Sequence, residues 1–150
     1  MTQATQSPLV QAAARIGSQV AAAHAADVDL NARFPREAVD AMKEARLLSA
    51  FVPKDLGGSG SGMDELAAVC ETLAQYCSAT AMIFAMHQIQ VACIARHARG
   101  VPFFDAYLRE LVEKQNLIAS VTSETGIGGE MRNSICAVER QGDRFVLNKD

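Results

Sequence analysis

Apolar residues recur every three or four positions along the first part of the chain, which is the period of an amphipathic helix. The pair Ser7-Pro8 predicts a capped start for the first helix, whose apolar stripe runs to about Ala26. The pair Phe34-Pro35 predicts the start of a second helix that ends near Leu48. Residues 49–53 then read as a short extended piece.

A glycine- and serine-rich loop, residues 56–62 (LGGSGSG), separates these helices from the next ones. A flexible linker is the simplest interpretation of this loop. Ser61 followed by Asp64 resembles a capping box and predicts that a third helix starts there. Ser78 predicts the cap of a fourth helix.

The segment from residue 72 to residue 95 contains no Asp, Glu, Lys or Arg. It is long enough to cross a membrane. It also holds polar side chains that are costly in lipid, namely Gln75, Ser78, Thr80, His87, Gln88 and Gln90. We therefore expect the central, buried helix of a soluble bundle and no membrane span.

Pro102 predicts the start of a fifth helix, and after Asn116 the period changes from 3.6 to 2. We expect strands at residues 117–122, 135–140 and 144–148, with a turn at 141–143. The pattern therefore predicts an α+β fold, in which an all-α domain of about five helices (residues 1–115) precedes the first strands of a β-domain (residues 116–150). Three strands make a sheet that is barely stable alone. We therefore expect the chain to be truncated, the front of a larger protein, or the sheet to be completed elsewhere.

Composition narrows the possible functions. The net charge of -3 argues against a nucleic-acid partner held by phosphate contacts. The 4 cysteines form no C-x-x-C pair, so the spacing typical of a metal site is absent. With no signal peptide in view, we expect reduced thiols and a cytoplasmic protein.

The stretch with the strongest functional signal is residues 117–129, LIASVTSETGIGG. It begins as an apolar strand and then offers hydroxyl groups and glycines, whose backbone can turn sharply or approach a ligand closely. Successive N–H groups of such a loop can form a nest for an anion or a polarised ring. A plain glycine-rich turn is the alternative. A dinucleotide fingerprint is excluded because Met131 stands at the third glycine position, and a phosphate loop is excluded because Gly-Lys-Ser/Thr is absent.

Three segments resemble the acyl-CoA dehydrogenase family, in an order that spans nearly the whole chain. Residues 34–60, FPREAVDAMKEARLLSAFVPKDLGGSG, look like the family's Phe-Pro helix and the Val-Pro…Gly-Gly-Ser-Gly loop after it. Residues 77–90, CSATAMIFAMHQIQ, look like its buried helix beside the acyl pocket. Residues 121–134, VTSETGIGGEMRNS, look like its flavin-contacting stretch, usually Thr-Glu-Pro-x-x-Gly-Ser-Asp.

The resemblance implies a helical domain, a middle β-domain and a C-terminal four-helix bundle, with FAD between them and usually a homotetramer. It implies that the flavin lies against Ser120, Thr122 and Ser123. Gly128 and Gly129 would approach the cofactor phosphates or the CoA thioester arm. Hydroxyl and N–H donors at the ring nitrogens suit a flavin.

The resemblance also implies an acyl pocket along one face of the fourth helix. The residues of that face are Met82, Met86, His87 and Gln90. A histidine is unlike a plain fatty-acyl pocket, and flavin monooxygenases on the same fold sometimes carry one in this region. A buried histidine with satisfied hydrogen bonds is the structural alternative.

Three positions depart from the family motif: Thr125 stands for Pro, Gly129 for Ser and Glu130 for Asp. The lost serine leaves Gly129 with only its backbone to offer. The Thr-Glu pair, which flavin monooxygenases on this fold often lose, survives as Ser123-Glu124.

The implied function is the N-terminal portion of an FAD-dependent acyl-CoA dehydrogenase. In that reaction a carboxylate removes the α-proton of an acyl thioester while hydride passes from the β-carbon to the flavin. The family's base comes from the C-terminal bundle, so no catalytic residue is assigned, and Glu124 is expected to be structural.

The expected partners are an acyl-CoA substrate, an electron-accepting flavoprotein and further copies of the chain. Two alternatives stay open: a monooxygenase on the same fold, and a non-catalytic helical module that binds a partner through its exposed sheet edge.

Overall fold

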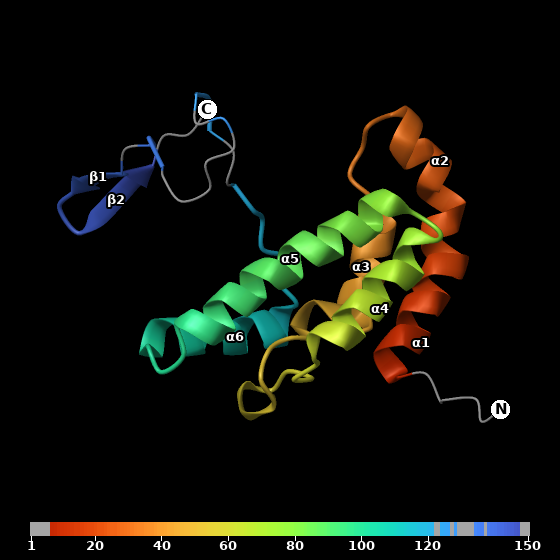
Figure 1. The fold of residues 1–150 in the computed structure, drawn as a ribbon, viewed down its shortest axis with the longest axis horizontal. Coiled ribbons are helices and arrows are strands. Elements are labelled where there is room, and N and C mark those ends of the chain that lie inside the picture. The colour runs from red at the N-terminus through yellow and green to blue at the C-terminus, as the bar shows by residue number, and fades with distance from the viewer. Residues whose placement is uncertain (1–6, 122–123, 127, 129–133, 137, 148–150) are drawn as a thin grey trace. The chain divides into compact units, whose positions relative to one another are not determined.

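The computed structural model describes residues 7–121, 124–126, 128, 134–136 and 138–147 (Figure 1). The chain divides into a helical unit, Met1–Ala119, and a C-terminal unit, Ser120–Asp150. Among the described residues, all helices lie in the first unit and a two-stranded sheet lies in the second. The predicted α+β class, with helices before strands, is confirmed.

The first helix is a single long run. It consists of α1 (Pro8–Ile16), the π-helical turn η1 (Gly17–Ala21) and α2 (Ala22–Leu30), which follow one another without a break. The predicted cap is confirmed, because the Ser7 hydroxyl accepts a hydrogen bond from the Val10 N–H at 3.3 Å.

This run ends at Leu30, beyond the predicted end near Ala26. Val28 is buried and continues the apolar contact of the helix with the core. Asn31 then ends the run, and its amide donates to the Asp27 carboxylate at 2.6 Å. The sequence pattern missed this extension because the added turn is exposed on most of its surface.

The second predicted helix is shorter than expected. It forms α3 (Arg36–Glu44), after which come two 3-10 turns, η2 (Leu47–Ser49) and η3 (Lys54–Leu56). The predicted extended piece at residues 49–53 is wrong at its start, since its first residue ends η2 and Ala50 has helical angles (φ -57°, ψ -45°).

The other three predicted helices are present as α4 (Met63–Ala74), α5 (Ser78–His97) and α6 (Pro102–Lys114). Their predicted serine caps are wrong. The cap position of α4 is Gly62 and that of α5 is Cys77, so neither serine is the cap residue. No side-chain cap bond is made at either helix start.

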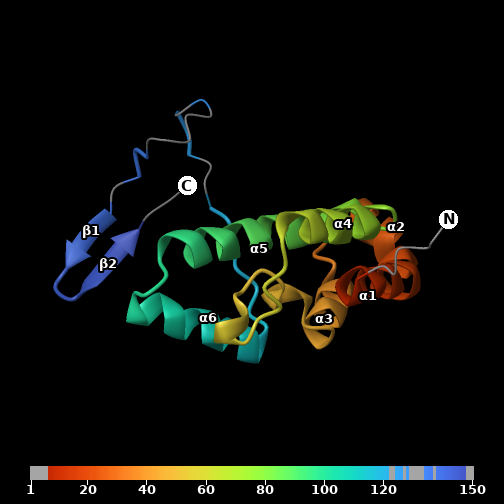
Figure 2. The same ribbon diagram turned by 60° about the horizontal axis from the view of Figure 1, so that its bottom comes forward.

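Within the helical unit, α4 and α5 lie in one layer above α3 and α6 (Figure 2). α4 packs against both α1 and α5, and α5 also contacts α6 and η2. The side chains that fill the space between the layers are fully buried and include Met42, Leu47, Leu48, Leu73, Phe84 and Leu108.

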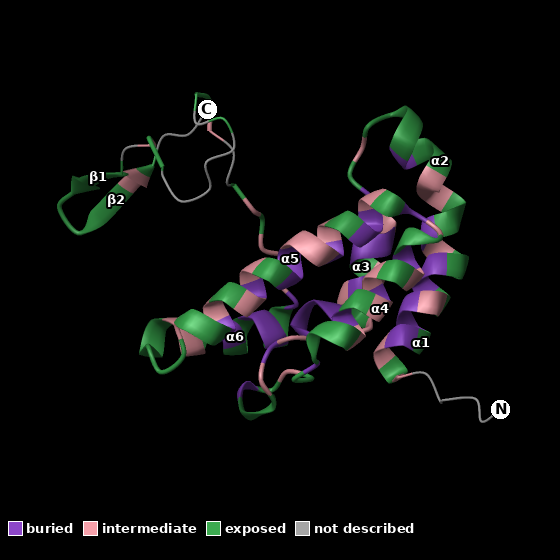
Figure 3. Ribbon diagram, in the orientation of Figure 1, coloured by how far each residue is buried: buried purple, intermediate pink, exposed green. Residues whose placement is uncertain are grey.

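α5 is long and apolar enough, by length and composition, to cross a membrane. In this structure one side of α5 faces the core of the helical unit and the other side is accessible (Figure 3). Its buried side includes two polar side chains, His87 and Gln88, which bond to the main chain of neighbouring segments. This is the packing expected of a central bundle helix.

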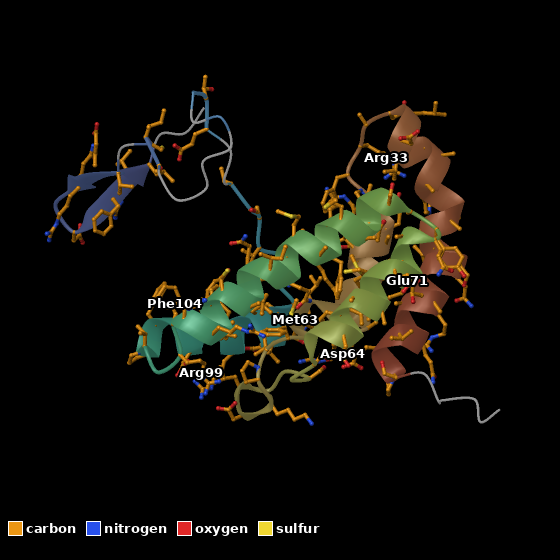
Figure 4. The ribbon with its side chains drawn as sticks, viewed as in Figure 1. Arg33, Met63, Asp64, Glu71, Arg99 and Phe104 are labelled. Carbon is orange, nitrogen blue, oxygen red and sulfur yellow. The ribbon has the colours of Figure 1, made fainter. Side chains whose placement is uncertain are left out.

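An ion-pair network joins the segments at the far end of α5. Arg99 lies just after α5 (Figure 4) and donates to the Asp55 carboxylate in η3 at 2.7 Å. It also pairs with Asp105 in the first turn of α6 at 3.5 Å. Arg99 and its two partners are partly or largely exposed, so solvent reaches these ion pairs.

The C-terminal unit contains one hairpin. β1 (Val138–Gln141) pairs antiparallel with β2 (Arg144–Leu147), and Gly142, with φ 64°, is in the turn as predicted. β1 begins later than the predicted strand at 135–140, and the predicted end of β2 at residue 148 lies outside the described residues. The predicted strand at 117–122 is not formed over its described residues 117–121.

Candidate functional site

The predicted flavin-contacting residues fall partly inside the described structure. Ser120 is half-buried, and Gly128 is exposed. Thr122, Ser123 and Gly129 lie outside the described residues.

Gly128 adopts a left-handed conformation, with φ 55°, and a Cβ built on it would meet nothing within 4 Å. Glycine is therefore favoured here by its backbone angle, and no atom of the described residues lies against it. Gly126 has φ 93°, and a Cβ there would lie in ordinary contact with the Ile135 side chain at 3.8 Å.

Glu124 closes the loop that contains these glycines. Its carboxylate accepts hydrogen bonds from the Ser134 hydroxyl at 2.5 Å, the Ile135 N–H at 2.8 Å and the Cys136 N–H at 3.3 Å. A carboxylate that accepts several donors in this way is held as a structural anchor. The arrangement agrees with the expectation that Glu124 is structural.

The predicted acyl face of α5 separates into two parts. Met82 is 61% exposed, and Met86 and Gln90 are half-buried on the same side of the helix. His87 is 0% exposed and faces the core. The next residue along a helix is turned by about 100°, so neighbours such as Met86 and His87 reach different surroundings.

Both ring nitrogens of His87 are bonded to main-chain groups. The Ile118 N–H donates to Nδ1 at 3.0 Å, and Nε2 lies 2.7 Å from the Leu48 carbonyl oxygen. A backbone N–H only donates and a carbonyl only accepts, so the ring must be neutral with its proton on Nε2. Burial lowers the pKa of His87 from its ordinary value, and the hydrogen bond to Leu48 opposes that shift.

Gln88 continues the same polar cluster. Its amide nitrogen donates to the carbonyls of Leu47 (3.0 Å) and Leu48 (3.3 Å), and its amide oxygen accepts from the Phe51 N–H at 3.3 Å. Gln115 holds the segment from the other side, with its amide nitrogen 2.9 Å from the Ser49 hydroxyl. Two side chains of α5, His87 and Gln88, thus satisfy main-chain groups around η2, while Gln115 bonds to a side chain there, the Ser49 hydroxyl.

Comparison with known proteins identifies the family. Residues 3–100 match the family described as "Acyl-CoA dehydrogenase, N-terminal domain". The chain belongs to the acyl-CoA dehydrogenase family. The match covers the helical unit to the end of α5 and supports the resemblance drawn from the sequence.

Curated relatives within this acyl-CoA dehydrogenase family carry different reaction names. The chain is 33% identical over 144 residues to 3-sulfinopropanoyl-CoA desulfinase of Paraburkholderia xenovorans (95% of this chain, 37% of the relative). It is 30% identical over 129 residues to cyclohex-1-ene-1-carbonyl-CoA dehydrogenase of Syntrophus aciditrophicus (85% and 31%). It is 27% identical over 126 residues to acryloyl-CoA reductase (NADH) of Anaerotignum propionicum (83% and 32%). The chain spans about a third of the length of these relatives.

The described part of the glycine loop suits the flavin expected of an acyl-CoA dehydrogenase. The loop combines a hydroxyl at Ser120 with two glycines at positive φ, Gly126 and Gly128. Among the described residues, no atom lies within 4 Å of a Cβ built on Gly128, which suits a ligand that approaches the backbone there. Ser120 and the loop offer neutral donors and acceptors of the kind that bind a flavin ring.

Sequence reasoning missed a groove between α4 and α5. It has a volume of about 460 Å³ and is lined by residues of the α4 stretch 63–70 and the α5 stretch 85–97. Met63, at the start of α4, lines its α4 side (Figure 4), and Arg96, near the end of α5, lines its α5 side. The spacing of Met63, Ala67 and Cys70 along an exposed side of α4 was an available signal. Met82, Met86 and Gln90 do not line this groove, so it and the predicted acyl face are distinct surfaces of the acyl-CoA dehydrogenase helix α5.

Proposed function

We propose that this chain is the N-terminal part of an FAD-dependent acyl-CoA dehydrogenase that performs α,β-dehydrogenation of an acyl thioester. The observation that carries the proposal is the family match over residues 3–100. The stretch 121–134, which comes after α6, resembles the family's flavin-contacting stretch and supports the same conclusion.

In this proposal the chain supplies one wall of the cofactor site. Ser120, Thr122 and Ser123 donate to the flavin, and Gly128 and Gly129 allow its phosphates or the thioester arm to approach the main chain. FAD, when bound, supplies the hydride acceptor of the reaction. The α-proton is removed by a carboxylate from another part of the protein, so the role of this chain is to bind and orient.

The substrate proposal is an acyl-CoA. The names of the three relatives all contain a CoA thioester, although they describe a desulfinase, a dehydrogenase and a reductase. We infer that the acyl group lies along the accessible face of α5 at Met82, Met86 and Gln90. An electron-accepting flavoprotein, assembly as a homo-oligomer and a cytoplasmic location complete the proposal.

The monooxygenase alternative depended on a histidine in the acyl pocket. His87 is fully buried, and both of its ring nitrogens are bonded to the main chain. No observation on the described residues therefore favours that alternative over the dehydrogenase.

The deciding experiment is an ultraviolet–visible spectrum of the purified full-length protein. We expect a tightly held oxidised flavin whose absorbance is bleached by acyl-CoA under anaerobic conditions. Flavin that is lost during purification and is not bleached by any acyl-CoA would favour the monooxygenase. A colourless protein that also fails to bind added FAD would contradict both flavoenzyme functions and leave the helical interaction module.

A further inference from the structure

His87 connects three segments that are distant in the sequence. The ring is carried by α5, its Nε2 donates to Leu48 in η2, and its Nδ1 accepts from Ile118, which follows α6. Because the bonded groups are a main-chain carbonyl and a main-chain N–H, the two bonds fix backbone positions at both segments.

Its neighbour Gln88 shows what is specific to His87. Gln88 bonds to Leu47, Leu48 and Phe51, all in the segment around η2. The Leu48 carbonyl therefore keeps a donor even without His87, whereas the Ile118 N–H is bonded to the His87 ring. Both side chains donate hydrogen bonds to main-chain carbonyls of η2. Of the two, His87 is the one that also bonds to the segment after α6.

Ile118 lies where the chain leaves the helical unit. The unit ends at Ala119, and Ser120, the first predicted flavin contact, follows. The described residues 117–121 form no helix or strand, so no regular ladder of backbone bonds holds this exit segment (residues 117–119). The side chains of Leu117 and Ile118 pack against the core, and the His87 acceptor fixes the main chain of the segment at the Ile118 N–H.

We propose that His87 is a positioning residue that fixes the exit segment through its Nδ1 and thereby orients the flavin-contacting stretch that follows. The second half of this inference rests on the proposed function. His87 touches neither substrate nor cofactor in this role. Its Nδ1 fixes the position of the Ile118 N–H, from which the chain continues to Ser120. Its bond to Leu48 holds the ring in the required tautomer.

Two substitutions in the full-length protein separate the two bonds of the ring. In His87→Asn, the amide oxygen can take the place of Nδ1 and keep the bond from Ile118, while the bond to Leu48 is lost. In His87→Gln, the longer amide can take the place of Nε2 and keep the bond to Leu48, while the Ile118 N–H is left without its acceptor. Both variants replace the ring by a smaller amide, and His87→Asn loses one methylene group more than His87→Gln. Lost packing alone would therefore disturb His87→Asn more, which is the opposite of the order expected here.

The measurements are amide hydrogen exchange at Ile118 by mass spectrometry and flavin content per subunit. We expect exchange at Ile118 to be faster by roughly tenfold or more in His87→Gln, because a part-buried donor without its acceptor favours local opening. His87→Asn should exchange at close to the wild-type rate. Flavin content should fall in His87→Gln and be largely retained in His87→Asn.

Gln88→Leu is the matched control. It removes the bonds to η2 from the adjacent position and should lower the melting temperature without changing exchange at Ile118 relative to neighbouring amides.

Equal exchange at Ile118 in His87→Asn and His87→Gln would overturn the proposal, as would flavin content that follows melting temperature in all three variants. A wild-type protein that binds no flavin would contradict the proposed function instead, and the exchange measurement would still decide whether His87 fixes the exit segment.

Discussion

Two glycine-rich loops of this chain have similar compositions and different structural reasons for their glycines. The first glycine loop, residues 56–62, lies in the helical unit, and the second glycine loop, residues 125–129, lies in the C-terminal unit. In the first, a Cβ at Gly58 would overlap the carbonyl oxygen of Val52. In the second, a Cβ at Gly128 would meet no atom of the described residues within 4 Å.

The main chain holds the first glycine loop in place. The Gly60 N–H donates to the Val52 carbonyl at 2.9 Å, and the Ser61 N–H donates to the Ala50 carbonyl at 2.9 Å. The interpretation of this loop as a flexible linker is therefore wrong. The second glycine loop has a different anchor, the Glu124 carboxylate, which bonds to residues 134–136.

This difference shows what a glycine implies about function. A glycine required by a neighbour in the same chain contributes to folding. A glycine at positive φ with open space beside it leaves room for something outside the chain. The predictions below test this distinction at Gly58 and Gly128, and the anchor of the second glycine loop at Glu124, in order of decreasing effect on stability.

The largest effect is expected for Gly58→Ala. The new methyl group would meet main-chain atoms of Val52, which cannot move aside as a side chain can, so unfolding should become easier by about 3 kcal/mol. Thermal or urea unfolding of the full-length protein measures this change. Gly100→Ala is the control, because Gly100 has φ 80° and open space, and it should cost only about 1 kcal/mol. Equal costs at the two positions would mean that the packing of Gly58 is not the reason for glycine there.

A smaller effect is expected for Glu124→Gln. The substitution replaces an ionised acceptor of three donors by a neutral amide with one acceptor oxygen, which should cost about 1–2 kcal/mol locally. Amide exchange at Ile135 and Cys136 should become faster. The same substitution at the exposed Glu139 of β1 changes the net charge equally and should leave both amides unaffected. Unchanged exchange in Glu124→Gln would show that the carboxylate does not anchor the loop.

The helices could be predicted from the sequence because most of them carry a clear apolar stripe. α5 is an exception, since its polar side chains before Arg96 are uncharged and no charged face marks which side meets solvent. Its existence was therefore predictable, whereas the inward direction of His87 was not. The prediction of a flexible linker at residues 56–62 was wrong for a related reason. Glycine is needed at position 58 because of Val52, a tertiary neighbour that composition does not reveal.

The capping serines show the same limit at short range. Ser7 caps α1 through the Val10 N–H, whereas Ser61 fits the local pattern equally well and is buried without capping α4. The Ser61 N–H is bonded back to Ala50, so the packed loop fixes the backbone before α4 begins. Tertiary structure therefore overrides a local signal that depends on only a few residues.

The smallest effect on stability, and the most informative for function, is expected in the second glycine loop. Gly128→Ala and Gly126→Ala both place alanine at a positive φ, so each should cost roughly 1 kcal/mol in the apo protein. They differ in surroundings, because a Cβ at Gly126 contacts Ile135 and a Cβ at Gly128 faces open space. If the cofactor approaches the backbone at Gly128, flavin content per subunit should fall in Gly128→Ala well beyond the fall in Gly126→Ala, at similar apo melting temperatures. Normal flavin content in Gly128→Ala, with only a lowered melting temperature, would mean that the flavin does not bind beside this glycine. The flavin contacts would then have to lie elsewhere in the stretch, nearer to Ser120.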